Sequence, residues 1–317
     1  MGVWTTKGSL SPPFTIGIIF QHEIGNNSNI GEYQLVKQEM NESERQRDTP
    51  RHWIGNLVWP GVMSDGRRFL HGVLPPTIGA PPGKRPLAEA LGSHSRAMIN
   101  AFGSANGETG RTLLVGANQV HGQKIEYVDE ETNLSQGVAI PGLDERFSLI
   151  EFPETDGLVA RVTKDTPDVM LVIQTADCLP ILFFDPVTGL IGACHCGWRG
   201  LIAGLAGKTA QQMIEMGVDP QTLEAWIGPG IGVANYEVGT ELVGRFEKAF
   251  ESVRVSPNGT HLNLGAVASG DLRRAGLGEA HVTDSQVCTY DHPEHLHSFR
   301  RDGEKAGRSL TVIGIAG

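Results

Sequence analysis

The amino-acid sequence predicts an α+β fold in which mixed β-sheets are flanked by helices. Short apolar runs typical of strands recur along the chain, and three longer segments carry apolar residues at helical spacing. These strands and helices intermix without the strict alternation of a doubly wound sheet. The 317 residues, 39% hydrophobic and 20% charged, are ordinary for a globular protein and can bury a substantial core as one large domain or two smaller ones.

The first 110 residues carry weak and interrupted signals. Residues 14–20 form an apolar run that predicts a strand, and residues 32–51 form a charge-rich stretch that is either a solvated helix or a loop. Residues 73–86 contain five prolines, which predicts an irregular excursion over the surface. A helix is expected over residues 88–102.

The signals are much stronger from residue 111 onward. Buried strands are expected over 112–120 and 169–175, and residues 181–184 and 190–193 flank the turn sequence DPVTG as a hairpin. Two further strands and three amphipathic helices complete the pattern: strands at 225–228 and 309–315, and helices at 201–214, 238–250 and 264–275.

Charge and composition exclude several classes of protein. A formal net charge of −10 and a pI near 5.6 argue against general binding to nucleic acid or to an anionic membrane. No apolar run approaches the ~20 residues that span a bilayer, and no signal peptide is expected at the N-terminus. Three of the four cysteines fall within nineteen residues, unlike a disulfide framework, so we expect a reducing cytoplasm.

Three residues at the ends of apolar runs predict a metal site. His121 follows the run 112–120, Cys178 follows 169–175, and His195 follows 190–193. Two imidazoles and a thiolate suit Zn²⁺, and three protein ligands leave a fourth position open, as in catalytic zinc sites. The alternative is that each is an ordinary core residue, because the spacing alone proves nothing.

Neighbours of these three residues offer further candidates. Arg199 stands at a helix start, which is unfavourable for a cation unless an anion lies nearby, so it is a candidate for holding phosphate or a substrate oxygen. A salt bridge to an acidic neighbour such as Asp177 is the alternative. Asp177 is itself a catalytic candidate beside Cys178. Asp156, in the sequence TDG, either brings a carboxylate to the site or makes a turn, and Arg300 either contacts phosphate or is exposed to solvent.

Two other motifs point away from function. If residues 194–196 are extended, Cys194 and Cys196 point to the face opposite His195 and pack in the core. The run GPGIG at 228–232 lacks the third glycine of a dinucleotide fingerprint, so we expect a tight turn there. The chain also lacks the P-C-x-x-C half of the signature of cytidine-type deaminases. Its one His-x-His pair, at 295–297, is too few for a multicopper cluster.

Six motifs together resemble the YfiH-like family, also described as laccase-domain, polyphenol oxidase or peptidoglycan-editing-factor proteins. The motifs stand in family order: NQVHG at 118–122, TDGLV at 155–159, ADCLP at 176–180, HCGWRG at 195–200, IGPGIG with YEVG at 227–239, and SFRRDG with GR at 298–308. The resemblance covers residues 111–317 of one domain, 1–317, and residues 1–110 match poorly. The family's Leu-Asn-Leu…Val-Gly-Asp stretch is absent, with residues 77–80 in its place, and Cys196 stands where the family has a small residue.

The resemblance implies a zinc site formed by His121, Cys178 and His195. It also implies phosphorolysis of adenosine, inosine and methylthioadenosine, and deamination of adenosine. Zinc at such a site activates water at neutral pH, and phosphorolysis needs cations for the phosphate. Cys178, Arg199 and Asp177 are then the catalytic candidates, and the substrate-binding candidates are Arg300, Asp156 and Gln119. Purine nucleoside and phosphate are the partners expected, and the oligomeric state stays open.

Three other functions compete with this one. A copper-dependent polyphenol oxidase is disfavoured by the shortage of histidines. A hydrolase that edits peptidoglycan precursors would use Cys178 as its nucleophile. A non-enzymatic protein would use the metal only for stability.

Overall fold

The computed structural model describes residues 58–62, 68–74, 83, 85–94, 111–128, 137–163, 168–250 and 255–316. The strand expected over 14–20 and the charged stretch 32–51 lie outside these residues, as do residues 95–102 of the helix expected over 88–102. Contrary to that expectation, the helix ends at Gly92. In the part of the chain that is described, no helix is long and apolar enough to cross a membrane.

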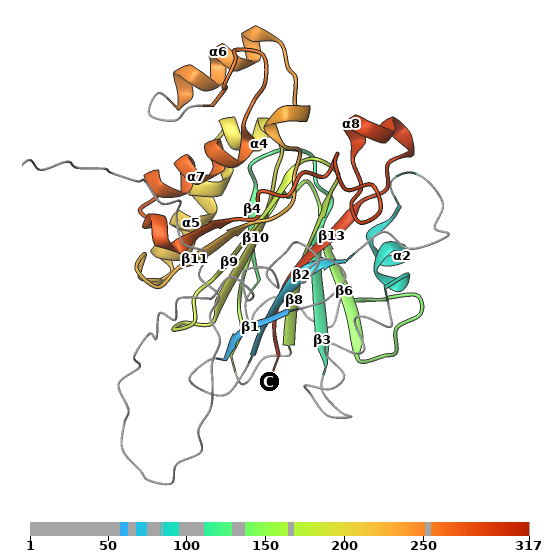
Figure 1. Cartoon of the computed structure of the whole chain (residues 1–317). Helices are drawn as coiled ribbons and strands as arrows, with labels where there is room; N and C mark the ends of the chain where they lie inside the picture. Colours follow the sequence, from blue (N-terminus) through green and yellow to red (C-terminus); the bar gives the residue numbers. More distant parts are fainter. Residues whose placement is uncertain are drawn as a thin grey trace, which may run out of the picture.

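Two mixed sheets form the centre of the molecule, which confirms the predicted α+β class (Figure 1). The first sheet has seven strands in the order β1-β2-β13-β8-β3-β6-β5. In it, β3 runs parallel to both β6 and β8, and β13 runs antiparallel to β2 and β8. Its strands are β1 (Val58–Val62), β2 (Arg68–Leu74), β3 (Thr112–Ala117), β5 (Val138–Ala139), β6 (Phe147–Phe152), β8 (Asp168–Thr175) and β13 (Ser309–Ala316).

The second sheet has six strands in the order β12-β11-β9-β10-β7-β4. The predicted hairpin is confirmed, because β9 and β10 pair antiparallel around the turn at 185–189. The strands of this sheet are β4 (Ile125–Val128), β7 (Gly157–Arg161), β9 (Leu179–Phe184), β10 (Leu190–Cys196), β11 (Glu224–Ile227) and β12 (Val282–Asp284).

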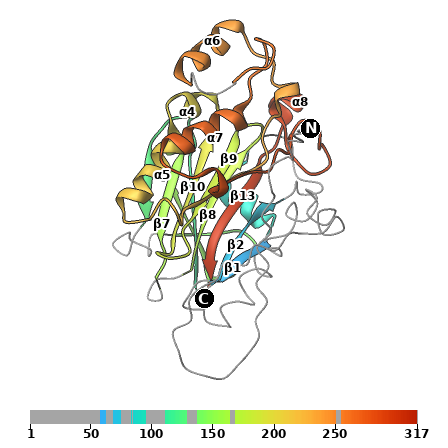
Figure 2. The same ribbon diagram turned by 60° about the vertical axis from the view of Figure 1, so that its left-hand side comes forward.

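The two sheets pack face to face, and helices cover the outer face of the second sheet (Figure 2). Successive side chains of β8 point to opposite faces of the first sheet. The face between the two sheets carries Val169, Leu171 and Ile173, and the opposite face carries Met170 and Val172. The helical elements are α2 (Leu87–Gly92), α4 (Trp198–Ile202), α5 (Leu205–Glu215), α6 (Thr240–Ala249), α7 (Leu264–Arg274) and α8 (Phe299–Asp302), with short 3-10 turns at Val233–Asn235, Glu279–His281 and Gly303–Lys305.

Four other sequence expectations need correction. The single helix expected over 201–214 is two helices, because Gly204 has a left-handed backbone (φ 76) between α4 and α5. The strand expected over 112–120 ends at Ala117. Val73 and Leu74 were expected to be irregular but complete β2, because the prolines begin only after them. Residues 228–232 are not a tight turn: they form an irregular segment that bridges Gly230 to Cys288.

Candidate metal centre

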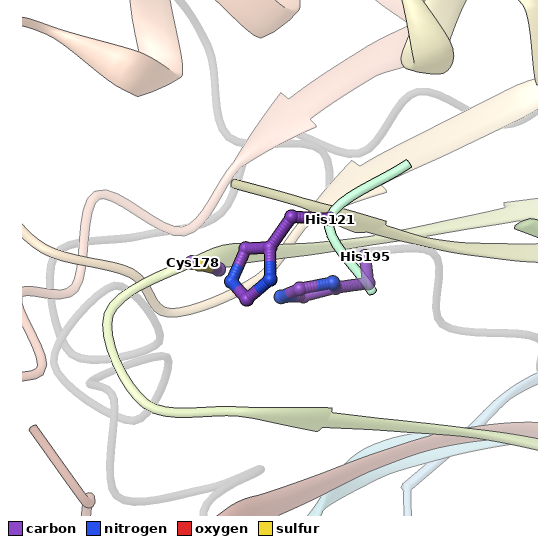
Figure 3. Close-up of side chains that lie close together, drawn as sticks. All are labelled: His121, Cys178 and His195. Atoms are coloured by element: carbon purple, nitrogen blue, oxygen red, sulfur yellow. The ribbon is translucent and has the colours of Figure 1, made fainter. Parts of the chain in front are cut away.

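The predicted trio of His121, Cys178 and His195 converges at one end of the sandwich (Figure 3). One potential ligand atom from each residue lies within 4.8 Å of the others. His121 follows β3 of the first sheet, His195 belongs to β10 of the second, and Cys178 lies in the link from β8 to β9 between the two sheets. The two imidazole rings meet edge to face, with centroids 4.8 Å apart.

Strand alternation explains why His195 joins this cluster. Ile191 and Ala193 of β10 point between the sheets, and His195 continues that face. Cys194 and Cys196 lie in the core under the helices, as predicted, with their Sγ atoms 3.5 Å apart. Their thiols are therefore on the side of the sheet away from the cluster.

The buried Asp156 carboxylate holds both histidines in place. Oδ1 accepts hydrogen bonds from Nδ1 of His195 (2.7 Å) and the backbone N–H of His121 (3.0 Å). Oδ2 accepts from the backbone N–H groups of Val120 (3.2 Å) and Gly122 (2.6 Å). Because Nδ1 of His195 is engaged by Asp156, its Nε2 is the nitrogen left for a metal, an orientation common in metal sites. Sequence reasoning weighed a turn against a carboxylate at the site, and Asp156 provides both.

The segment 120–122 folds around this carboxylate with an uncommon backbone conformation. His121 has φ 62, a left-handed value that a residue other than glycine rarely adopts. The three consecutive N–H groups that bind Asp156 stabilise it, so part of the cost of this conformation is offset by charge-assisted hydrogen bonds.

Gly197 leaves the space in which the three side chains meet. A Cβ atom on Gly197 would lie 2.9 Å from Cδ2 of His121 and 3.0 Å from Sγ of Cys178. Its backbone is extended (φ −73, ψ 172), so a larger residue could adopt this conformation without strain. Glycine is therefore required here for room and not for backbone freedom, and the cradle it leaves fits a metal ion between soft and nitrogen donors.

The electrostatics favour a thiolate in this cradle. Burial raises the pKa of Cys178, but the positive charge of His195 and hydrogen bonds from His121 and His195 lower it, to a net value of about 6. Burial lowers the pKa of His195, but the Cys178 thiolate and the hydrogen bond to Asp156 raise it, to about 9. The thiolate form that a metal needs is thus stabilised by the same neighbours that would share the ion.

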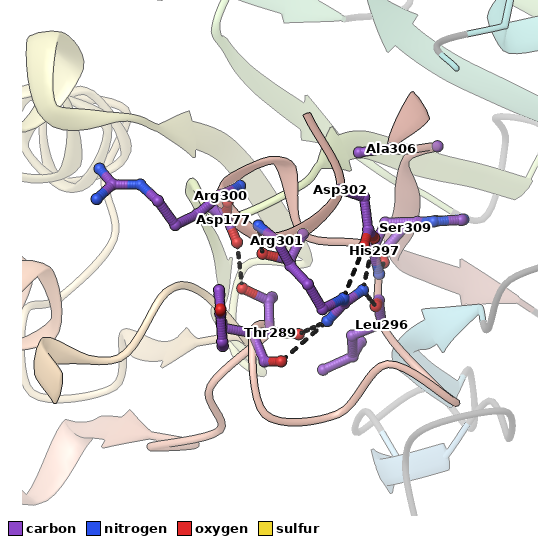
Figure 4. A network of polar contacts seen from close by, with 12 residues as sticks. Asp177, Thr289, Leu296, His297, Arg300, Arg301, Asp302, Ala306 and Ser309 are labelled. Carbon is purple, nitrogen blue, oxygen red and sulfur yellow. Dashed lines mark hydrogen bonds and ion pairs between the residues drawn. The ribbon is translucent and has the colours of Figure 1, made fainter. Parts of the chain in front are cut away.

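Asp177 anchors the turn that presents Cys178, as Figure 4 shows. Its backbone is left-handed (φ 88), and its carbonyl accepts from the N–H of Ile231 at 2.8 Å. Oδ1 accepts from Thr289 Oγ1 and Oδ2 from the backbone N–H of Arg300, both at 2.6 Å. Each carboxylate oxygen accepts one of these bonds, and among the described residues no ion pair joins Asp177 to Arg199, the alternative that the sequence left open.

The arginines predicted to be functional lie over aromatic rings. The Arg199 guanidinium carbon is 4.3 Å from the ring centroid of Trp198. That of Arg300 is 5.1 Å from the ring of Tyr236, and its Nη1 donates to the carbonyl of Glu237. Both arginines are exposed. Such stacking holds the guanidinium planes while leaving N–H groups at their edges.

Gln119 and Arg301 make contacts within the protein. The Gln119 side chain donates to the carbonyl of Gln174 and accepts from its N–H, which ties the segment after β3 to the end of β8. Arg301 donates to the carbonyls of Thr289, Tyr290 and Leu296 (Figure 4). The substrate contact predicted for Gln119 stays a prediction, as do those of Asp156 and Arg300.

Sequence reasoning missed several residues of this region. Thr289 is outside the six motifs, and no sequence signal marks it. Gly197, Tyr236 and Arg308 lie inside the motifs and so could have been singled out. Burial raises the pKa of Tyr236, as do the charges of Cys178 and Asp177, to about 12.

A family model described as multi-copper polyphenol oxidoreductase laccase matches residues 94–316, a span that includes all six motifs. The chain belongs to this family, which includes the YfiH-like proteins. The description of the family mentions several copper ions. Within the described residues of this protein, His121, Cys178 and His195 are the one group of side chains that could hold a metal ion.

Relatives of this laccase-type family carry names that refer to purine nucleosides. A purine nucleoside phosphorylase of Deinococcus radiodurans is 35% identical over 200 residues, 62% of this chain and 68% of the relative. A protein named adenosine deaminase, from an unknown prokaryotic organism, is 32% identical over 181 residues, 54% of this chain and 69% of the relative. The crystal structure of a hypothetical YfiH protein of Bacillus licheniformis covers 84% of this chain and 97% of its own, with a TM-score of 0.61 and 22% identity, which supports the fold.

Proposed function

We propose that this protein is a zinc-dependent enzyme of purine nucleosides, which cleaves adenosine, inosine and methylthioadenosine with phosphate and deaminates adenosine. The observation that carries the proposal is the convergence of three metal-binding side chains, of which His121 is exposed, in a family whose relatives are named for these two activities. We place the enzyme in the cytoplasm, because none of its described helices could span a membrane and its cysteines are free.

The metal would be held by Nε2 of His195, a ring nitrogen of His121 and Sγ of Cys178. Zinc bound there would supply a Lewis acid that activates water and polarises the substrate. We prefer zinc to copper because a thiolate with two imidazoles is a common zinc donor set, although the description of the family names copper.

The chain's own residues would orient the reactants. Asp156 fixes the ring plane of His195, and Asp177 fixes the turn at Cys178. We propose that Arg199 and Arg300 contact oxygens of the nucleoside, because both guanidinium groups are exposed and stacked on aromatic rings with N–H edges available.

The competing function is hydrolysis of a cell-wall precursor with Cys178 as nucleophile. The low pKa of Cys178, about 6, beside two histidines is the observation that favours it. In that case activity would depend on the thiolate and would survive removal of the metal.

The test is to incubate the zinc-loaded protein with adenosine, with and without phosphate, and to identify the products. We expect adenine and ribose 1-phosphate only when phosphate is present, and inosine in both cases. Chelation should abolish both reactions, and zinc should restore them. No product from adenosine in a fully loaded sample would exclude the proposal, and activity on a peptidoglycan precursor that resists chelation would favour the competing function.

A further inference from the structure

Arg308 lies at the same end of the sandwich as the metal centre, on the side of the first sheet. It directly precedes β13, whose first residue, Ser309, pairs with Thr175 at the end of β8. Cys178 follows Thr175 by three residues. Arg199 and Arg300 lie instead beside Trp198 and Tyr236, whose rings pack against the core beneath the helices.

The guanidinium of Arg308 is only partly used by the protein. Its Nη1 donates to the carbonyls of Ala306 (2.9 Å) and Gly307 (2.8 Å). An arginine carries five N–H donors, and within the described ranges no acceptor or carboxylate contacts the N–H groups on Nε and Nη2. The side chain is partly buried. A cation that has lost part of its hydration and has no paired carboxylate favours a bound anion.

Negative groups of the centre also act electrostatically on Arg308. Burial lowers the pKa of Arg308, whereas the charges of Cys178, Glu304 and Asp177 raise it. Asp177 is already engaged by Thr289 and by the N–H of Arg300. A metal bound by Cys178 would offset the negative charge of the thiolate, which would leave the positive charge of Arg308 without that counter-charge.

The ring of His297 lies beside Arg308, and the charges of two further arginines act on the same ring. A Cβ atom on Gly307 would come within 2.6 to 3.0 Å of three atoms of the His297 ring, so the ring rests on the backbone next to Arg308. Burial lowers the pKa of His297, and the charges of Arg308, Arg301 and Arg85 lower it further. The guanidinium group of Arg301 donates hydrogen bonds to backbone carbonyls and to Asp302. Arg85 donates to Ser93 and lines a cavity of about 250 Å³ at the ends of β3 and β8.

We propose that Arg308 binds the inorganic phosphate that attacks the nucleoside, holding it between its own free N–H edge and the metal centre. This inference rests on the proposed function. The planar fork of N–H groups matches two oxygens of a phosphate, which a lysine would not do. In the reaction, a phosphate oxygen forms the bond to C1′ as the bond from C1′ to N9 breaks. The purine keeps the electron pair and takes the proton of hydrogen phosphate.

The decisive experiment compares Arg308→Gln with the wild type as zinc-loaded protein. We expect an increase of about 10- to 100-fold in the apparent KM for phosphate, the range for losing hydrogen bonds to a charged group. Deamination of adenosine, which uses no phosphate, and the zinc content should stay within about twofold, since Arg308 is no metal ligand. Arg308→Lys should recover part of the phosphate affinity, because it keeps the charge and loses the fork.

The matched control is Arg273→Gln, which removes an exposed arginine from α7 and should leave both reactions unchanged. An unchanged KM for phosphate in Arg308→Gln would overturn the assignment, as would an equal loss of deamination and phosphorolysis. If Arg308→Gln does not fold, the same two criteria apply to Arg308→Lys.

A binding measurement separates this inference from the proposed function. Titration calorimetry of inorganic phosphate into wild type and Arg308→Gln does not depend on turnover. If the wild type cleaves no nucleoside but binds phosphate through Arg308, the proposed function fails and the anion site stands. If the wild type binds no phosphate, the site is refuted. Adenosine 5′-monophosphate is titrated in the same way. If Arg308→Gln loses binding of this nucleotide but binds inorganic phosphate as tightly as the wild type, Arg308 contacts a nucleotide and the inference is overturned.

Discussion

Replacing Asp156 by asparagine should weaken metal binding without removing a metal ligand. The carboxylate is fully buried and accepts four hydrogen bonds, two on each oxygen. Burial raises its pKa, but the hydrogen bonds of His195 and of the backbone outweigh burial and hold the pKa below its usual value. These hydrogen bonds therefore stabilise the ionised form of the Asp156 carboxylate.

The magnitude follows from the geometry of the four bonds. If the asparagine carbonyl takes the place of Oδ1, it keeps the bonds from His121 and His195. Its NH₂ group then points at the N–H groups of Val120 and Gly122, so two bonds are lost and buried donors face donors. At about 1.5 to 3 kcal/mol for each of the two bonds to a charged group, we expect a loss of about 3 to 6 kcal/mol in the free energy of unfolding.

The assay is a zinc competition titration with a chromophoric chelator, together with thermal unfolding. We expect zinc affinity to fall about 10- to 100-fold, the usual effect of removing a residue that orients a ligating histidine. The melting temperature should fall by about 6 to 24 °C, at about 2 to 4 °C per kcal/mol, the scale for domains of about 150 to 250 residues. A folded Asp156→Asn variant whose zinc affinity stays within twofold of the wild type would refute the reasoning.

Asp185→Asn is the matched control for this experiment. Asp185 is also fully buried, but it lies in the turn between β9 and β10, away from the centre, and accepts one hydrogen bond, from the N–H of Thr188. Its replacement should leave zinc affinity unchanged and destabilise the fold less, because at most one bond is lost.

Three further changes test the centre and the core. Cys178→Ala should lose most of the zinc by elemental analysis, whereas Cys196→Ala should keep it, because its thiol lies in the core under the helices; equal losses would contradict the strand alternation. Gly197→Ala should fold but bind zinc about tenfold more weakly, because its Cβ would crowd His121; unchanged affinity in the competition titration would show that the ring can move aside. Burial lowers the pKa of His71 to about 4. In the unfolded chain His71 is protonated below pH ~6.5, whereas in the folded chain it stays neutral down to pH ~4. The contribution of His71 to the free energy of unfolding is therefore complete above pH ~6.5 and falls by about 3 kcal/mol as the pH drops from ~6.5 to ~4. In denaturant titrations at several pH values, the free energy of unfolding of His71→Leu should fall less steeply between pH ~6.5 and ~4 than that of the wild type. The same pH dependence in both proteins would assign the effect to other titrating groups.

Much of the fold was readable from the sequence because its elements have strong local signals. The apolar run at 169–175 predicted β8 within one residue, and the DPVTG turn predicted the hairpin of β9 and β10. The helices expected over 238–250 and 264–275 were also found. Periodicity of 2 or 3.6 residues is a property of consecutive positions, so it survives without knowledge of the tertiary structure.

The contacts that build the site could not be derived in this way. Asp156 and His195 are 39 positions apart, and Asp177 and Thr289 are 112 apart. Neither pairing has a spacing rule, because each depends on which strands become neighbours. The break at Gly204 and the left-handed residue His121 were equally hidden, since a helical pattern of apolar residues continues across the break and a histidine gives no sign of a positive φ.

The centre joins parts of the chain that the two sheets otherwise keep separate, and this has a consequence for the apoprotein. His121 comes from the first sheet, His195 from the second, and Cys178 from the link between them. A bound ion therefore adds its binding free energy to the cohesion of the sandwich, by RT ln(1 + [L]/Kd). However, Asp156 and Asp177 hold the same segments through six hydrogen bonds to side chains and backbone that do not involve the ion. The geometry of the ligands is thus set by the protein before the metal arrives, so removal of the metal should lower the melting temperature and abolish turnover while leaving the fold in place.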